Sequence, residues 1–266
     1  MNTRFENNSF AKRLKSMLAV DFRRMFTTKL FYLLAGICLL VPVLIMVMTT
    51  MMDGSVSVDP NTGVETVMHA YDSVWQLIGT AEGSSSGGMD MMSMCNINLL
   101  YFGFAVLVGV FVSEDFKSGY AKNLFTVRAK KNDYVISKTV VLVTAGALLV
   151  AFFLLGTVLG GVFSGTSFAL GTVTVSNLVM CLLSKVLLIA IFVPIYLAVS
   201  VFAKQKTWLC ILGSCAVGML LFSMIPMVSP LTATMMNVIL CLAGGALFSV
   251  GLGSVSTLVL KKRDIL

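Results

Sequence analysis

The sequence contains few charged residues. Only 12 % of its 266 residues are Asp, Glu, Lys or Arg, and 58 % are hydrophobic, whereas soluble globular chains carry about 25 % charged residues. No polar stretch exceeds roughly 40 residues, which is too short for a sizeable water-soluble domain. The composition therefore predicts an integral membrane protein.

Residues and motifs for catalysis are also scarce. His69 is the single histidine, which excludes bis-histidine haem, histidine metal clusters and most histidine-dependent proteases. The six cysteines lie in or beside apolar runs without a C-x-x-C motif, so we expect them to be apolar helix residues. The chain lacks a G-x-x-x-x-G-K-[ST] motif and a usable nucleophile–histidine pair. We therefore expect no enzyme activity, no bound cofactor and no metal site.

Long apolar runs define the expected fold. A run of about 20 apolar residues predicts a membrane-spanning helix, because backbone amides in lipid must be hydrogen-bonded within the segment. The predicted spans are residues 30–52, 92–112, 139–163, 178–203, 208–227 and 237–260. They predict an all-α polytopic fold with six transmembrane helices in a single transmembrane domain, residues 1–266. The spans contain no Asp or Glu, which argues against an ion-coupled secondary transporter.

Lysine and arginine predict the orientation. All 19 basic residues except Lys185 lie before the first span, after the second, after the fourth or after the sixth. Residues 53–91 carry six acidic residues and no basic one. The positive-inside rule therefore places both termini and residues 113–138 in the cytoplasm, and residues 53–91 outside. The net charge of +7 then reflects topology and attraction to membrane lipid, and no nucleic-acid partner is expected.

Two features inside the spans allow more than one interpretation. Lys185 interrupts the fourth span; we expect its side chain to snorkel to the headgroups, and a functional charge is the alternative. Small residues recur at four-residue spacing and allow close helix approach. They can serve packing within the chain, a dimer seam or a translocation path. These positions are Gly156, Gly160, Gly245, Ser249 and Gly253.

Two segments outside the spans have amphipathic patterns. Residues 10–29 alternate apolar and basic residues at helical spacing, which predicts a helix lying in the membrane interface. The loop 113–138 carries nine charges, six of them basic. Within it, Tyr120 and Leu124 fall on one helical face beside Phe125, which predicts a short helix that acts as a docking surface. An ordinary positive-inside loop is the alternative.

The loop sequence SEDFKSGYAKNLFTVRAKKNDYVISKTV resembles the loop between spans two and three of ABC transporter permeases of the type-2 exporter (ABC-2) family. The segment DFRRMFTTKLFYLLAG resembles the amphipathic approach to the first span in that family, and the order of spans agrees along the chain. The basic position of the loop pattern can be Arg128, Lys130 or Lys131. The other matching positions are Glu114, Gly119, Leu124, Tyr134 and Lys138.

The resemblance implies a mechanism. Two permease subunits, as a homodimer or a heterodimer, would pair with cytoplasmic ABC ATPase subunits that bind ATP and Mg²⁺. The loop 113–138 would be the coupling loop that seats on the ATPase. The coupling residues implied are Glu114, Gly119, Tyr120, Leu124, Phe125, Arg128, Lys130, Tyr134 and Lys138.

The resemblance also implies a class of substrate. The chain is similar to bacitracin-export and lantibiotic-immunity membrane subunits, which expel peptide antibiotics, drugs or lipid-like amphipathic molecules across a bacterial plasma membrane. A non-transporting membrane partner or signalling subunit is one alternative. A channel or secondary carrier is another.

Overall fold

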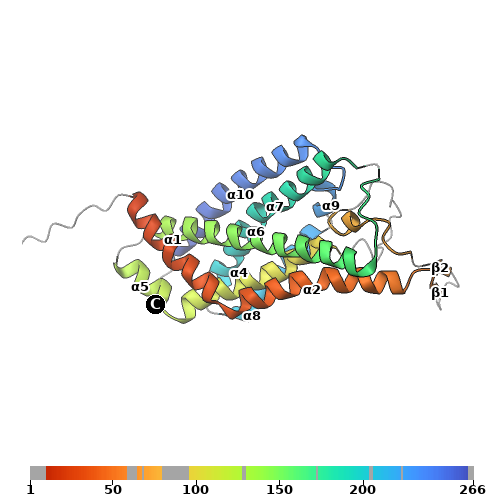
Figure 1. Ribbon diagram of the computed structural model, residues 1–266. Helices are drawn as coiled ribbons and strands as arrows, with labels where there is room; N and C mark the ends of the chain where they lie inside the picture. The colour runs from red at the N-terminus through yellow and green to blue at the C-terminus, as the bar shows by residue number, and fades with distance from the viewer. Residues whose placement is uncertain are drawn as a thin grey trace, which may run out of the picture.

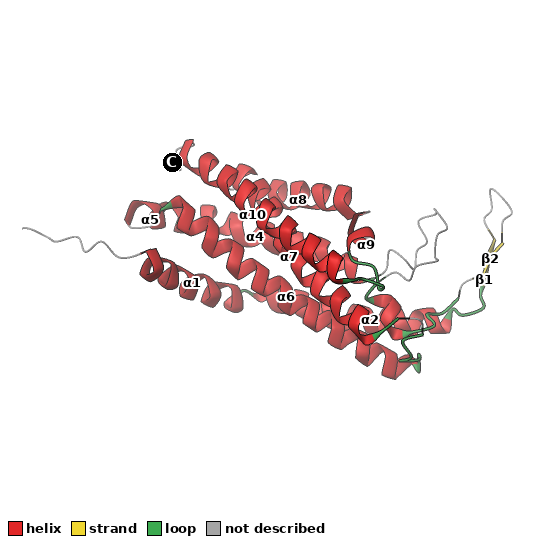
Figure 2. Cartoon of the chain, turned by 90° about the horizontal axis from the view of Figure 1, so that it is seen from above, coloured by secondary structure: helices red, strands yellow, loops and turns green. Residues whose placement is uncertain are grey.

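A computed structural model describes residues 10–58, 65–67, 69–79, 96–127, 130–171, 173–203, 206–222 and 224–262. Figure 1 shows an elongated bundle of helices. The bundle is built from α2 (Lys29–Met51), α4 (Leu100–Lys117), α6 (Lys131–Ser164), α7 (Val175–Ala203), α8 (Thr207–Phe222) and α10 (Met235–Lys262). Three shorter α-helices are α1 (Phe10–Thr27), α5 (Tyr120–Val127) and α9 (Met224–Val228). Two 3₁₀ helices are η1 (Val74–Leu77) and η2 (Ile97–Leu99). The strands β1 (Val56–Val58) and β2 (Glu65–Val67) form an antiparallel hairpin. The all-helical prediction therefore holds for the bundle, and the hairpin lies outside it (Figure 2).

The number of spans differs from the prediction. Within the described residues, five segments are long and apolar enough to cross a membrane: α2, η2 with α4, α6, α7 and α10. The helix α8 is apolar but has 16 residues, or about 24 Å of length against a hydrocarbon core of about 30 Å. The predicted span 208–227 is divided between α8 and α9. Pro226 is the third residue of α9, in the first helical turn, where the missing N–H of proline is tolerated.

The helix α6 starts earlier than the third predicted span. It begins at Lys131 rather than at residue 139 and has 34 residues, which is about 51 Å of helix. Because the hydrocarbon core is about 30 Å thick, this helix is long enough to project from the membrane. An apolar run indicates only the part of a helix that lies in lipid. The first two turns of α6 are polar, so the apolar run alone predicts a later start for this helix.

Glycine allows α2 and α6 to lie side by side. A Cβ atom at Gly156 would overlap the backbone oxygen of Leu39, and one at Gly160 would lie 3.0 Å from the Cα atom of Val43. These contacts are backbone to backbone, so a larger residue would force the two helices apart. Gly156 and Gly160 therefore serve packing within the chain.

The small residues of α10 also contact helices of the same chain. A Cβ atom at Gly245 would lie 3.2 Å from the Cβ atom of Ala190 in α7. The hydroxyl of Ser249 donates to the backbone oxygen of Ala190 at 3.5 Å. A Cβ atom at Gly253 would lie 3.7 Å from Val135 of α6. This face of α10 therefore packs on α7 and approaches α6.

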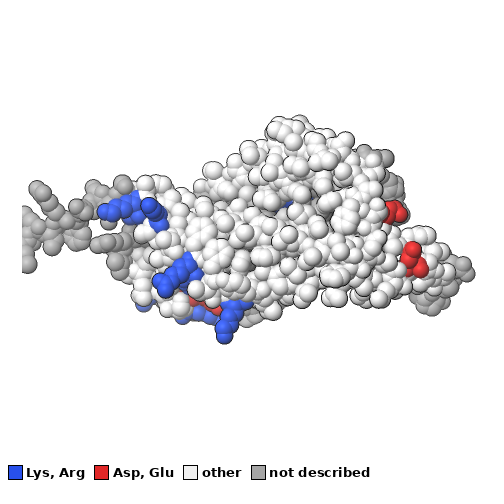
Figure 3. Space-filling model, in the orientation of Figure 1, with Lys and Arg blue, Asp and Glu red and all other residues white. Residues whose placement is uncertain are grey.

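Charge divides the molecule into two ends. Figure 3 shows lysine and arginine gathered at the end where α1 lies, and acidic residues at the opposite end. We call the first the basic end; it contains α1, α5, the start of α6 and the end of α10 (Figures 1 and 2). On the face shown, basic side chains therefore predominate at the end of α1 and acidic side chains at the opposite end.

Candidate functional site

The helix α1 buries an acid on its apolar face. Met17, Asp21 and Met25 are spaced four residues apart and are all buried, and α1 packs against α6. Residues at this spacing share one side of a helix, so the carboxylate of Asp21 points into the protein with the two methionines. A buried carboxylate is tolerated only when it is paired and hydrogen-bonded.

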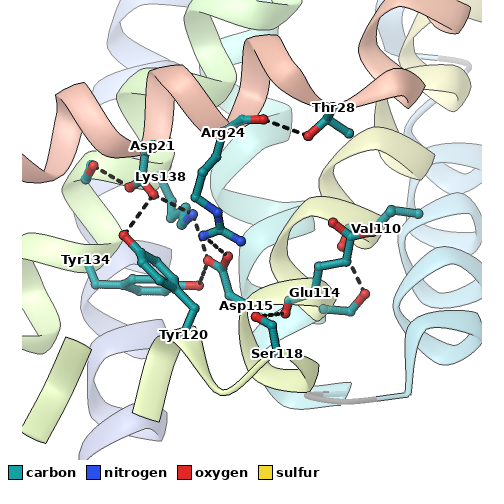
Figure 4. A network of polar contacts seen from close by, with 12 residues as sticks. Asp21, Arg24, Thr28, Val110, Glu114, Asp115, Ser118, Tyr120, Tyr134 and Lys138 are labelled. Carbon is teal, nitrogen blue, oxygen red and sulfur yellow. Dashed lines mark hydrogen bonds and ion pairs between the residues drawn. The ribbon is translucent and has the colours of Figure 1, made fainter. Parts of the chain in front are cut away.

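The partner of Asp21 is a lysine that serves two acids. The Lys138 Nζ atom of α6 lies 2.9 Å from Asp21 Oδ1 and 2.7 Å from Asp115 Oδ2. The guanidinium of Arg24 binds the other Asp115 oxygen at 2.5 Å. Figure 4 shows these side chains meeting between α1, the end of α4 and the start of α6. Two carboxylates and two cations therefore balance inside one cluster.

Hydroxyl groups complete the cluster. Tyr134 donates to Asp115 at 2.9 Å and Ser137 donates to Asp21 at 2.7 Å. The hydroxyl of Tyr120, at the start of α5, reaches Asp21 at 3.5 Å. We call the whole set the charged junction; its members are Asp21, Arg24, Asp115, Tyr120, Tyr134, Ser137 and Lys138. Because its carboxylates are hydrogen-bonded as well as paired, the junction meets the condition for stable buried charge.

Aromatic rings enclose the cations. Lys138 Nζ lies 4.1 Å from the ring centroid of Phe111, and the Arg24 guanidinium lies 4.1 Å from that of Tyr120. Both distances are within the range of cation–π attraction. Burial, together with the nearby Asp21 and Asp115 carboxylates, raises the pKa of Tyr120 to about 12. Tyr120 is therefore protonated at neutral pH and available as a hydrogen-bond donor.

Two further contacts tie the same region together. Arg13 of α1 binds Asp133 of α6 at 3.0 Å. The Lys131 ammonium, also in the first turn of α6, donates to the backbone oxygen of Leu260 near the end of α10. The start of α6 is thus connected to α1 on one side and to α10 on the other.

A tight turn presents α5 at the basic end. Gly119 has φ 73°, a left-handed conformation that glycine adopts without strain, and it separates α4 from α5. Ala121 is buried and Phe125 is half-buried, with its ring edge-on to Tyr134 at 5.4 Å between centroids. Lys122, Asn123 and Thr126 are exposed. The helix α5 therefore has one face on the bundle and one polar, exposed face.

The predicted coupling residues fall into three places. Glu114 and Lys130 are exposed, and Leu124 is half-buried with Phe125 on the inner face of α5. Tyr120, Tyr134 and Lys138 point into the charged junction. Arg128 lies outside the described residues. The loop pattern therefore combines surface positions with positions that contact the rest of the protein internally.

Sequence reasoning missed four junction residues: Asp21, Arg24, Asp115 and Ser137. One signal was available for Asp21, because it is an acid at four-residue spacing from two methionines in an otherwise basic helix. Asp115 had no such signal: it follows directly after the exposed Glu114, and composition cannot tell which of two adjacent acids points inward. Only the packing of α1 on α6 distinguishes them.

Lys185 forms a separate buried contact in α7. The prediction that its side chain snorkels to the headgroups is wrong: Lys185 is 1 % exposed, and its ammonium donates to Asn98 Oδ1 at 2.8 Å. The hydroxyl of Tyr101 donates to the backbone oxygen of Lys185 at 2.9 Å. A lysine held this way connects η2 and α4 with α7.

Among the described residues, no group of three or more His, Cys, Asp or Glu is placed to hold a metal ion.

These features define a class of protein. The described part of the chain is a polytopic bundle of apolar helices with opposite charge at its two ends, a buried charged junction and a short helix displayed beside it. This is the architecture of a membrane-embedded protein.

Comparison with protein families identifies the class further. Residues 22–214 match the family described as ABC-2 family transporter protein. The match covers more than half of the chain, so the protein belongs to the ABC-2 family of transporter proteins and is a membrane permease of the ABC transporter class. The matched range contains every residue of the charged junction except Asp21, which precedes this range by one residue. Comparison with curated proteins and with solved structures gave no match.

Proposed function

We propose that the chain is the membrane-spanning subunit of an ABC exporter and that a separate ATPase subunit docks on α5. The main support for this proposal is the charged junction. It joins α1, α4 and α6 through ion pairs of 2.5–2.9 Å, and the half-buried Tyr120 of α5 reaches it at 3.5 Å. The exposed face of α5, with Lys122, Asn123 and Thr126, lies next to it.

The proposed topology has six crossings with both termini in the cytoplasm. The five long apolar segments supply five crossings, and α8 together with α9 supplies the other. The charge difference between the two ends supports the orientation, because lysine and arginine favour the cytoplasmic side. The basic end and α5 would then face the compartment that contains ATP.

The junction would transmit movement from α5 to the membrane helices. Removing one partner from a buried ion pair costs about 3–5 kcal/mol, which is far more than the roughly 0–1 kcal/mol of an exposed pair. Displacing α5 is therefore expected to move α1, α4 and α6 as a unit rather than to separate them. ATP and Mg²⁺ would bind to the ATPase, and two copies of the permease, or this chain and a sister subunit, would enclose the transport path.

The substrate we propose is an amphipathic molecule, such as a peptide antibiotic, a drug or a lipid-like compound. Support comes from the middle of the bundle helices α2, α4, α6, α7, α8 and α10. Lys185 is the one Asp, Glu, Lys or Arg in the described residues of these helices that lies more than eight residues from a helix end. Ion-coupled carriers usually need a carboxylate within the membrane. Such an interior fits a pump that takes its energy from ATP and its substrate from the membrane, here a bacterial plasma membrane.

Co-purification tests the proposal. The tagged chain is isolated from its native membrane in mild detergent and its partners are identified by mass spectrometry. We expect a stoichiometric soluble protein with a P-loop motif, and substrate-dependent ATP hydrolysis that is lost when the P-loop lysine is replaced. A folded chain that co-purifies with no ATPase, or transport that persists without ATP, would contradict the exporter proposal.

A further inference from the structure

A groove runs between α6 and α10 at the basic end. It has a volume of about 560 Å³, and its walls include Val135, Ile136 and Val140 from α6 and Val250 and Leu258 from α10. Several of these apolar side chains are exposed: Val140 is 42 % and Leu258 is 54 % exposed. The groove is thus open along the outside of the bundle and has mainly apolar walls, to which Thr139, Ser249, Ser254 and Thr257 add hydroxyl groups.

One end of the groove is positively charged. Lys261, in the last turn of α10, lines it together with the amide of Asn132 in the first turn of α6, and both side chains are exposed. Among the described residues that line the groove there is no Asp or Glu. The groove therefore has an apolar length and a cationic mouth, and the mouth lies at the basic end.

The groove and the charged junction share one stretch of α6. Tyr134 and Lys138 point into the junction, whereas Val135, Ile136 and Thr139 line the groove. These two sets occupy neighbouring faces of the same two helical turns. The Lys131 ammonium holds the turn preceding them to the backbone oxygen of Leu260. Whatever fills the groove therefore contacts the segment that carries Lys138.

We infer that the groove binds an anionic phospholipid, with its phosphate at Lys261 and an acyl chain along the apolar walls. The charge of the mouth and the absence of a carboxylate from the described lining select for an anion. The apolar walls, open to the side of the bundle, select for a ligand with a hydrocarbon chain. Basic pockets between membrane helices near the cytoplasmic surface bind acidic headgroups in this way. The bound lipid would brace α6 against α10 and so hold the junction in place.

Lipid titration tests the site without any measurement of transport. The delipidated protein is mixed with phosphatidylglycerol or phosphatidylcholine, and bound lipid is counted by native mass spectrometry. We expect Lys261→Ala to weaken binding of the first phosphatidylglycerol about fivefold. The matched control is Lys262→Ala, which removes the same charge from the adjacent exposed residue outside the groove, and it should change the affinity less than twofold.

Three results would overturn the inference. Equal losses in the two lysine variants would show general attraction to a basic surface. Equal affinity for phosphatidylcholine would show that the mouth does not select an anion. Displacement of the lipid by glycerol phosphate at a similar concentration would show a site for a soluble anion. Each result is independent of whether the chain exports anything.

A second pair of variants tests the apolar part of the groove. Ser254 lines the groove and is exposed, whereas the next residue, Val255, is exposed but outside it. We expect Ser254→Trp to fill the channel and abolish the high-affinity phosphatidylglycerol site, and Val255→Trp to retain it. If Ser254→Trp binds phosphatidylglycerol as the wild type does, the acyl chain does not lie in this groove.

Discussion

Lys138 is the residue on which the charged junction depends. Its ammonium is within 3 Å of carboxylate oxygens from two helices, and Lys138, Asp21 and Asp115 are all 0 % exposed. In the Arg13–Asp133 pair, by contrast, the arginine side chain is 22 % exposed, and solvent weakens such pairs. The ion pairs of Lys138 and the Arg13–Asp133 pair have similar distances. Because the pairs of Lys138 are buried, the loss of one partner is expected to cost much more stability there.

Replacing Asp115 tests this difference at the residue scale. Asp115→Asn removes the partner of both Arg24 and Lys138, so we expect it to destabilise the protein by about 3–5 kcal/mol. The preceding residue, Glu114, is exposed, and Glu114→Gln should change stability by less than about 0.5 kcal/mol. Thermal unfolding in one detergent compares the two variants. Equal shifts of the midpoint would show that Asp115 is not part of a stabilising cluster.

A double-mutant cycle tests the pairing of Lys138 with Asp21. Lys138→Met leaves Asp21 buried without its cation, and we expect a strong loss of stability. Adding Asp21→Asn removes the unpaired charge and leaves the neutral Arg24–Asp115 pair, so the double variant should recover about 1–3 kcal/mol relative to additivity. Strictly additive effects on the unfolding free energy would mean that the two groups do not interact.

At the scale of elements, α5 is small but well placed. Its 8 residues are too few to form a stable helix alone, so it depends on Ala121, Leu124 and Phe125 against the bundle. The polar side chains on its other face are exposed, and the hydroxyl of Thr126 donates only within α5, to the backbone oxygens of Lys122 and Asn123. This division assigns the inner face to stability and the outer face to docking.

Reversing a charge on the outer face of α5 tests the docking assignment. We expect Lys122→Glu to weaken ATPase association roughly fivefold, because it removes one attraction and adds one repulsion of about 0.5 kcal/mol each. Lys206→Glu makes the same charge change at an exposed residue between α7 and α8 and should have little effect. Binding of the ATPase to the permease in nanodiscs gives both values. A larger loss from Lys206→Glu would move the docking site away from α5.

The sequence predicted the helices better than it predicted the side-chain contacts between them. Apolar periodicity indicated the long helices, and the spacing of Tyr120 and Leu124 indicated α5, because both signals are local. The earlier start of α6 and the division of residues 208–227 between α8 and α9 were not predicted. Polar helical turns add nothing to an apolar run, and residues 208–227 are largely apolar on both sides of the division. The pairing of Asp21 with Lys138 spans 117 positions, and no local pattern encodes it.

At the scale of the whole molecule, the two ends differ in charge and in proposed environment. Cysteine labelling of intact cells tests this directly. Ser55, after α2, and Ser118, after α4, are both exposed at opposite ends of the bundle. In a background without the native cysteines, an impermeant maleimide should react with Ser55→Cys and not with Ser118→Cys until the cells are opened. The reverse pattern would invert the topology.

The molecule also has a continuous connection from its docking face to its lipid-facing side. The helix α5 contacts the junction through Tyr120, the junction holds α6 through Lys138, and a neighbouring face of α6 lines the groove beside α10. An ATPase and a membrane lipid would therefore act on the same two turns of α6 from different sides. Transport that depends on acidic lipid follows from this arrangement.

Photo-crosslinking from α5 tests the central claim most directly, because it requires no knowledge of the substrate. A photoreactive amino acid replaces Asn123 on the outer face of α5, or Ser55 at the other end as the control, and native membranes are irradiated. The account predicts a crosslink from position 123 to a P-loop ATPase and none from position 55. An ATPase that co-purifies with the chain but crosslinks only from position 55, or from neither position, would contradict it.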